Sequence, residues 1–209
     1  MIKIGELMAH EYRRQDQREK GSERRGLVPG SVGLQEGIMT RERTLMLVIT
    51  YPASPQDRKA AINELAESVT TVKDKDGLRY IATEADNVFH SKTAVSRLQG
   101  DVDCLKYIVR WASKPEVKND ALNELIGMLS SLIDPGALQL IIDSNCPIGS
   151  KLQAVRNLAH NRERGSLLET AEMAPDMVVR RAAAYELRRH FGIKNADELI
   201  TKYPTALAA

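Results

Sequence analysis

Aromatic side chains are scarce in this chain: Phe, Tyr and Trp together make up 4% of its 209 residues. A core with so few rings must be built from Leu, Ile, Val and Ala. Those residues suit close-packed helices better than strands, which favour aromatic and β-branched side chains. The formal charge is only +2, so no strong overall field favours nucleic acid or an acidic membrane surface. Composition therefore favours an all-α protein.

Cysteines and long apolar runs are also nearly missing. Cys104 and Cys146 are the two cysteines, and neither belongs to a CxxC pair. We therefore expect free thiols in a reducing compartment rather than a disulfide. No stretch approaches the roughly 20 apolar residues of a membrane-spanning helix, and the first residues contain no secretory apolar run. We expect a cytoplasmic protein that does not associate with a membrane.

Residues 1–39 differ from the rest of the chain and predict a polar, partly extended N-terminal arm. The run HEYRRQDQREKGSERR is almost entirely polar, and GLVPGSVGLQEG is rich in glycine. Such a segment cannot offset the entropy of its own ordering, so it is either a mobile tail or an arm that orders on a partner. The candidate partner-binding residues of the arm are Tyr12, Arg13, Arg14, Leu27, Val28, Val32 and Leu34.

A helical domain is expected over residues 40–209. TRERTLMLVITYP predicts a leading helix over residues 40–51, with Thr40 as a capping candidate. SPQDRKAAINELAESV then begins with Ser54 and Pro55, a cap followed by proline at the first helical position. Its apolar residues recur at steps of three and four, as on one face of a helix.

A short motif of alanine, an apolar residue, two variable residues and leucine recurs five times. The copies are AINEL, AVSRL, ALNEL, AVRNL and AAYEL, beginning at Ala61, Ala94, Ala121, Ala154 and Ala183. Their spacings are 33, 27, 33 and 29 residues, and a second apolar stretch with a leucine follows each copy. Each unit therefore predicts two short helices: helix A, which carries the motif, and helix B after it.

The units AVRNL with LLETAEM, and VVRRAAAYELRR with DELI, resemble HEAT-like repeats. They are most similar to the short repeats, about 30 residues long, of phycobilin lyase subunits. The resemblance covers about residues 54–203 and implies a right-handed α-solenoid of about five helix pairs. Two units depart from the mean: the third A helix is expected to be long, over residues 115–132, and the A helix of unit two has a weak pattern that ends at Gly100. Such repeats serve unrelated purposes, so the resemblance says more about fold than about function.

Catalytic and cofactor signals are weak. The four histidines form no pair at metal-ligand spacing, and the glycine-rich GLVPGSVG lacks the lysine of a phosphate-binding loop. Cys104 lies on an apolar helix face and is expected to be a core residue. Cys146, in a loop before Pro147, is expected to be more exposed. We expect no metal, no cofactor and no enzymatic activity.

Basic residues accumulate toward the C-terminus. Residues 151–194 hold nine Lys or Arg against five Asp or Glu. HEAT-like DNA glycosylases use a basic concave surface, so nucleic acid is a second hypothesis; the other explanation is that arginines flank a buried stripe and cover it with their stems. In VVRRAAAYELRR we expect Val179, Ala183 and Leu187 to face inward. The candidate polyanion-binding residues are Arg156, Arg180, Arg181, Arg188 and Arg189.

The sequence thus favours a non-catalytic scaffold or adaptor in a larger assembly, which binds one or more proteins through the repeat surface and the N-terminal arm. The first alternative is nucleic-acid binding by the C-terminal repeats. The second is a subunit of a bilin-lyase-like or glycosylase-like enzyme.

Overall fold

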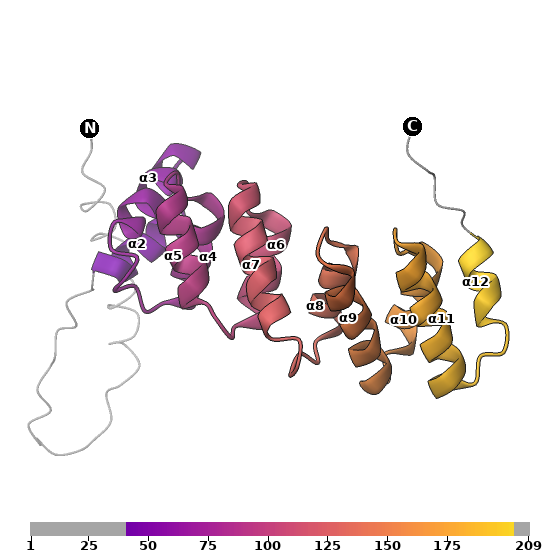
Figure 1. Cartoon of the computed structure of the whole chain (residues 1–209). Coiled ribbons are helices and arrows are strands. Elements are labelled where there is room, and N and C mark those ends of the chain that lie inside the picture. The colour runs from indigo at the N-terminus through magenta and orange to yellow at the C-terminus, as the bar shows by residue number, and fades with distance from the viewer. Residues whose placement is uncertain (1–40, 203–209) are drawn as a thin grey trace, which may run out of the picture. The chain divides into compact units, whose positions relative to one another are not determined.

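A computed structural model describes residues 41–202. The described residues all belong to one compact unit, Met39–Ala209. All regular elements between residues 41 and 202 are α-helices (Figure 1), which confirms the all-α fold expected from composition. Their bounds are α2 Arg41–Thr50, α3 Pro55–Ala66, α4 Lys75–Glu84, α5 Val88–Arg97, α6 Val102–Trp111, α7 Pro115–Gly127, α8 Pro135–Asp143, α9 Ile148–His160, α10 Arg164–Met173, α11 Met177–Phe191 and α12 Ala196–Lys202.

Helix starts follow local chemistry. The hydroxyl of Ser54 accepts a hydrogen bond from the Asp57 amide at 3.1 Å, and Pro55 occupies the first helical position, as the sequence predicts. Asp74, Asp101 and Asp134 cap α4, α6 and α8 in the same way. The leading helix is present as α2, and its candidate cap, Thr40, lies outside the described residues.

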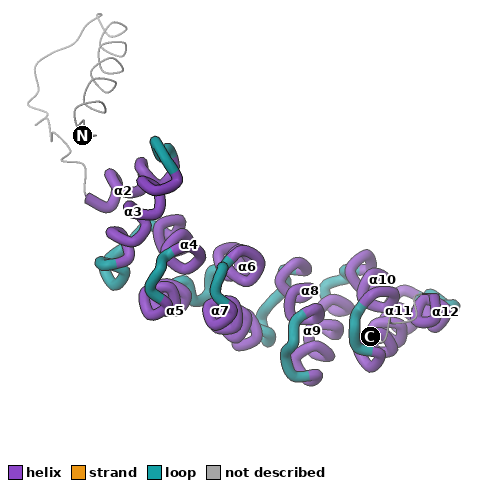
Figure 2. The backbone as a smooth tube through the Cα atoms, turned by 90° about the horizontal axis from the view of Figure 1, so that it is seen from above, coloured by secondary structure: helices purple, strands orange, loops and turns teal. Residues whose placement is uncertain are grey.

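The helices pair differently from the prediction. The A helices are α3, α5, α7, α9 and α11, and the B helices are α4, α6, α8, α10 and α12. The first four B helices each pack most extensively against the A helix that follows, not the one before, and α2 packs against α3 in the same manner. Only α12 packs most extensively against the A helix before it, α11, as predicted. The links inside these hairpins are three or four residues long, but the α5–α6 and α9–α10 links are equally short, so the pairing follows from side-chain packing rather than from link length. Figure 2 shows the hairpins from above.

Neighbouring hairpins contact one another through equivalent helices. The contacting pairs include α4 with α6, α5 with α7, α6 with α8 and α9 with α11, and α12 packs on α10 and α11. The buried apolar side chains form one continuous cluster from α2 to α12. Each hairpin therefore completes the core of the next.

The repeated motif forms the centre of this core. All five motif alanines and all five motif leucines are buried. Val179, Ala183 and Leu187 are each fully buried, so the inward face predicted for VVRRAAAYELRR is confirmed. Alanine allows neighbouring helices to approach closely, and leucine one turn later fills the space between them.

The structure corrects the end of one predicted helix and shows a regular helix where the sequence pattern was weak. The third A helix, α7, ends at Gly127 rather than at Leu132, because the chain turns there; Leu129 and Leu132 are nevertheless buried. The second A helix, α5, is a regular helix of ten residues, and Gly100 follows it with a φ of 86° that favours glycine.

No helix within residues 41–202 combines the length and the apolar character needed to cross a membrane.

Overfilling the motif seam should destabilise the fold. Ala121 is fully buried, so Ala121→Leu is expected to lower the free energy of unfolding by about 1–3 kcal/mol, because the larger side chain separates packed helices. Ala60→Leu is the matched control, since Ala60 is exposed on α3. Urea denaturation followed by circular dichroism measures both. Equal effects of the two substitutions would contradict the seam.

Candidate functional site

The five candidate arginines occupy three kinds of environment. Arg180 is only 3% exposed, and its Nε donates a hydrogen bond to the Ala174 carbonyl at 2.5 Å. Arg188 is exposed but forms an ion pair with Asp197 at 2.9 Å. Arg156, Arg181 and Arg189 are exposed, and none of them forms an ion pair with the described part of the chain. The structure therefore removes Arg180 from any exposed basic surface.

Arg180 belongs to a position that recurs in every A helix. The fourth residue of each A helix is polar; these residues are Arg58, Ser91, Lys118, Lys151 and Arg180. Three more of them donate a hydrogen bond back to the end of the preceding helix: Arg58 to the Ile49 carbonyl at 3.0 Å, Ser91 to Ile81 at 3.1 Å, and Lys118 to Arg110 at 3.4 Å. Lys151 holds the same position and is buried.

This recurring bond has a clear physical cause. The last four carbonyls of a helix have no partner within the helix, and a cation near them also interacts favourably with the helix dipole. Lys114 adds to the pattern by donating to the carbonyl of Ala85, the C-cap residue directly after α4, and burial lowers the pKa of Lys114. We did not predict this set from the sequence, although its members lie three residues before each motif alanine at the same spacing.

A groove of about 380 Å³ lies between α9 and α11. Residues from both helices line it: Leu152, Val155 and Arg156 from α9, and Val178, Ala182, Tyr185, Glu186 and Arg189 from α11. On each helix these positions follow steps of three and four, so each helix presents one stripe to the groove. The first residues of both stripes are apolar, and both stripes end in arginine.

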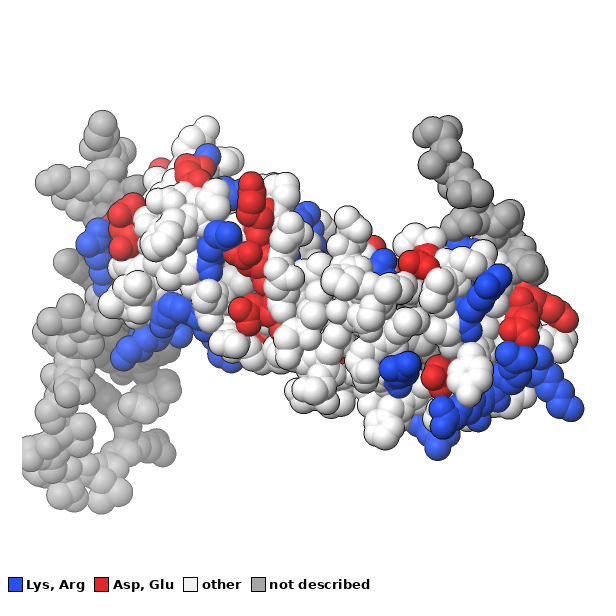
Figure 3. All heavy atoms as spheres, in the orientation of Figure 1, with Lys and Arg blue, Asp and Glu red and all other residues white. Residues whose placement is uncertain are grey.

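Charge in this groove is only partly balanced. Glu186 is 8% exposed and lies 3.2 Å from Nε2 of His190, one turn along α11. No ion pair within residues 41–202 involves Arg156 or Arg189. Figure 3 shows Lys and Arg side chains gathered over the lower end of α11, whereas acidic side chains form a row over α7. The side chains that line this groove therefore carry more positive than negative charge.

A second hollow, of about 520 Å³, lies at the turn between α5 and α6. Its main charged groups neutralise each other, because Lys75 pairs with Asp101 at 2.7 Å. Asp101 is also the cap of α6. These residues thus join neighbouring hairpins, and we assign the hollow no binding role.

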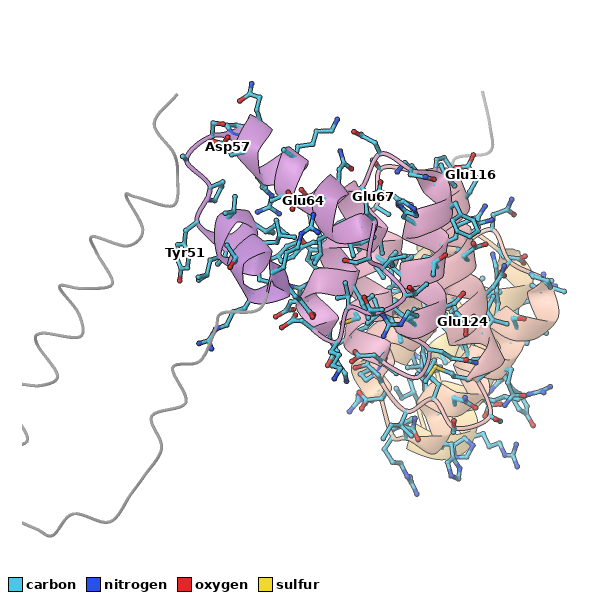
Figure 4. The ribbon with its side chains drawn as sticks, turned by 90° about the vertical axis from the view of Figure 1, so that its left-hand side faces the viewer. Tyr51, Asp57, Glu64, Glu67, Glu116 and Glu124 are labelled. Carbon is cyan, nitrogen blue, oxygen red and sulfur yellow. The ribbon has the colours of Figure 1, made fainter. Side chains whose placement is uncertain are left out.

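Exposed apolar side chains collect where the short links join a hairpin's two helices. Eight of the ten large exposed apolar residues lie in such a link or within two residues of one: Tyr51, Val88, Phe89, Trp111, Ile148, Met173, Met177 and Val178. We call this set the link edge. Figure 1 shows the α8–α9 and α10–α11 links on the upper side of the view. In Figure 4 Asp57 and Glu116, near the starts of α3 and α7, share the upper margin, whereas Tyr51 lies below it.

The remaining residues that bear on a site are those of the N-terminal arm, side chains able to bind a metal, and the two cysteines. The candidate residues of the N-terminal arm lie outside the described residues. No cluster of three or more metal-ligating side chains occurs within residues 41–202. Cys104 is buried, as expected for a core residue, and burial raises the pKa of its thiol to about 11. Cys146 is more exposed, which confirms that expectation, and its thiol lies 3.3 Å from the Ile141 carbonyl.

Comparison with models of protein families, with curated proteins and with solved structures gave no match. Function is therefore inferred from the surfaces of this chain.

Replacing Arg180 should destabilise the protein, whereas replacing its neighbour should not. Arg180→Met keeps much of the side-chain volume but removes the donor to the Ala174 carbonyl, so we expect a loss of about 1.5–3 kcal/mol in unfolding free energy. Arg181→Met, at an exposed position, should change it by less than about 0.5 kcal/mol. Urea titration measures both. A stable Arg180→Met variant would contradict the structural role.

Cys104 should be unreactive in the folded protein. A thiol with a pKa of about 11 is almost fully protonated at pH 8, and only the thiolate attacks a disulfide reagent. In a Cys146→Ser variant, which isolates Cys104, we expect no reaction with a thiol reagent at pH 8 until urea unfolds the chain. Complete labelling within minutes in native buffer would show that Cys104 is accessible.

Proposed function

We propose that this chain is a non-catalytic protein-binding scaffold, built as a right-handed α-solenoid of HEAT-like hairpins and acting within a larger cytoplasmic assembly. Its unpaired thiols fit a reducing compartment. Proteins built from repeated hairpins present an extended surface, and they generally use it for binding. The proposal includes the N-terminal arm as a further contact region, on the sequence pattern alone.

Bonds that span one repeat support the solenoid part of the proposal. Arg97 donates to the Val69 carbonyl, and Asn157 donates to the equivalent Leu129 carbonyl at 2.6 Å. Lys106 pairs with Asp134 at 2.9 Å, and Lys92 pairs with Asp120 at 3.1 Å. The partners are 28 residues apart in each case, so each bond ties one hairpin to its neighbour.

The link edge is the observation that carries the binding role. Its members are not scattered: Phe89 and Trp111, at 72% and 67% exposure, lie at consecutive links. Exposed apolar residues that occur singly need no explanation, but a set that recurs at one structural position along the chain is typical of an interaction surface. Aromatic and methionine side chains, which this edge contains, are enriched in protein interfaces.

Nucleic-acid binding is the second candidate function, because Arg156, Arg181 and Arg189 are exposed. It has less support than protein binding, since the five candidate arginines reduce to three once Arg180 and Arg188 are assigned to the Ala174 carbonyl and to Asp197. Three phosphate contacts give weak binding at physiological salt. A bilin-lyase-like or glycosylase-like enzyme is a third hypothesis, which predicts a bound chromophore or base excision by the purified protein.

Removing the link edge should abolish partner binding. The test is affinity capture from cells that produce this protein naturally, with bound proteins identified by mass spectrometry. Wild type should retain a reproducible set of proteins, and Phe89→Ser with Trp111→Ser should lose them, because the apolar contact area disappears. Ile133→Ser is the matched control: Ile133 is 72% exposed but lies between α7 and α8, away from the short links.

Thermal melts must first show that all variants remain folded. A chain lacking residues 1–37 tests the arm, which fails if it retains the same partners equally well. Equal recovery with the edge variant, or no protein above background, would refute the scaffold. Recovery of nucleic acid alone would support the second candidate.

A further inference from the structure

We propose that the groove between α9 and α11 binds an acidic, amphipathic segment of a partner protein; this inference rests on the proposed scaffold function. The apolar side chains of the segment lie against Leu152 and Val178. Its carboxylates lie at Arg156 and Arg189. The groove thus specifies the chemistry of the partner, which the link edge alone does not.

The apolar part of the groove continues the link edge. Val178 belongs to both, and it is 53% exposed although it is apolar. One turn along α11, Ala182 leaves space between the helices, and Tyr185, 54% exposed, forms the side of that space. A partly exposed tyrosine beside a small residue can bury a large area at a low entropic cost, which is typical of residues that dominate binding.

The basic part of the groove determines the sign of the partner. Arg156 and Arg189 come from different helices, and each is the last residue that its helix contributes to the groove. Within the described residues neither guanidinium forms an ion pair, although the adjacent Arg188 pairs with Asp197. Arginine binds carboxylates with two parallel hydrogen bonds, so a partner with Asp or Glu beside these arginines gains both charge and geometry.

The length of the groove sets the spacing in the partner. Val178 and Arg189 are eleven residues apart on α11, which corresponds to about 16 Å along a helix. A helical partner therefore places its acidic group about eleven residues from its apolar anchor, and an extended one about five residues away. An acidic segment without anchors, or an apolar one without acids, fills only half of the groove.

A nucleic acid fits this groove less well. A phosphate backbone requires a row of cations, whereas here two arginines stand beside Leu152, Val155, Val178 and Ala182, which offer nothing to a phosphate. Glu186 also lines the groove and adds a negative charge there. A peptide can place an apolar side chain at this point. A nucleic acid, which has a phosphate at every nucleotide, would place a charge there.

The test is selection of random 16-residue peptides on the full-length protein, followed by fluorescence anisotropy of the enriched peptides. We expect enriched sequences to combine apolar anchors with a cluster of Asp or Glu. Arg156→Glu with Arg189→Glu should weaken their binding at least about tenfold, since two attractions become repulsions. Tyr185→Ala should weaken it about three- to tenfold. Arg164→Glu, at an exposed position of α10 outside the groove, is the control and should change affinity less than about twofold.

Changing the peptide's Glu to Gln should have the same effect as the double arginine variant, and so should raising the salt concentration. Enriched peptides that are basic or purely apolar would overturn the inference. Binding of a 20-nucleotide DNA, with no peptide recovered, would assign the groove to nucleic acid. A dimer seen by light scattering and lost in the double arginine variant would assign it to a second copy of this chain.

The two proposals can fail separately. Peptides whose binding is lost with Phe89→Ser and Trp111→Ser, but kept in the double arginine variant, would refute the groove and leave the scaffold intact. The groove is likewise refuted, and the scaffold is left intact, if no peptide is recovered while affinity capture still yields partners. Failure of both peptide selection and affinity capture would refute the scaffold itself.

Discussion

Close approach of neighbouring helices at the motif alanines is the contact on which the described fold depends. All five alanines and the leucines one turn later are buried, and an alanine side chain has no atom beyond Cβ to hold packed helices apart. A single hairpin has an apolar stripe that it cannot cover by itself. The next hairpin covers it and presents a stripe of its own. Each hairpin is thus stabilised by its neighbours, so replacing one alanine destabilises the adjacent hairpin as well.

Helix ends determine which cations are free to meet a partner. Arg58, Lys118 and Arg180 each donate to a carbonyl at the end of the preceding helix. These bonds satisfy groups that would otherwise lack a partner, so the cations belong to the architecture rather than to a binding surface. A count of basic residues therefore overstates the charge offered to the outside. Near the C-terminus, Arg156, Arg181 and Arg189 remain exposed and form no ion pair within residues 41–202.

The helical character and the inward face of each A helix were predictable, because buried alanine and leucine recur at helical spacing. The pairing of helices was not. Motif copies mark A helices but say nothing about whether α4 packs better on α3 or on α5, which depends on three-dimensional packing. Arg180 and Arg181 show a second limit: two identical neighbours differ in burial because successive residues point about 100° apart on a helix. The burial of Arg180 could have been predicted from the sequence, because a polar residue stands three positions before every motif alanine.

Extensive contacts within residues 41–202 join only hairpins that are adjacent along the chain. No part of this fold must wait for a distant segment to arrive, and the loops closed during folding are about one repeat long, so their entropic cost is small. The same locality means that one hairpin could be duplicated or deleted while the remaining interfaces keep their partners. Such a chain could therefore lengthen by the addition of whole hairpins. Each added unit would also bring a new link, and with it a new place for an exposed side chain.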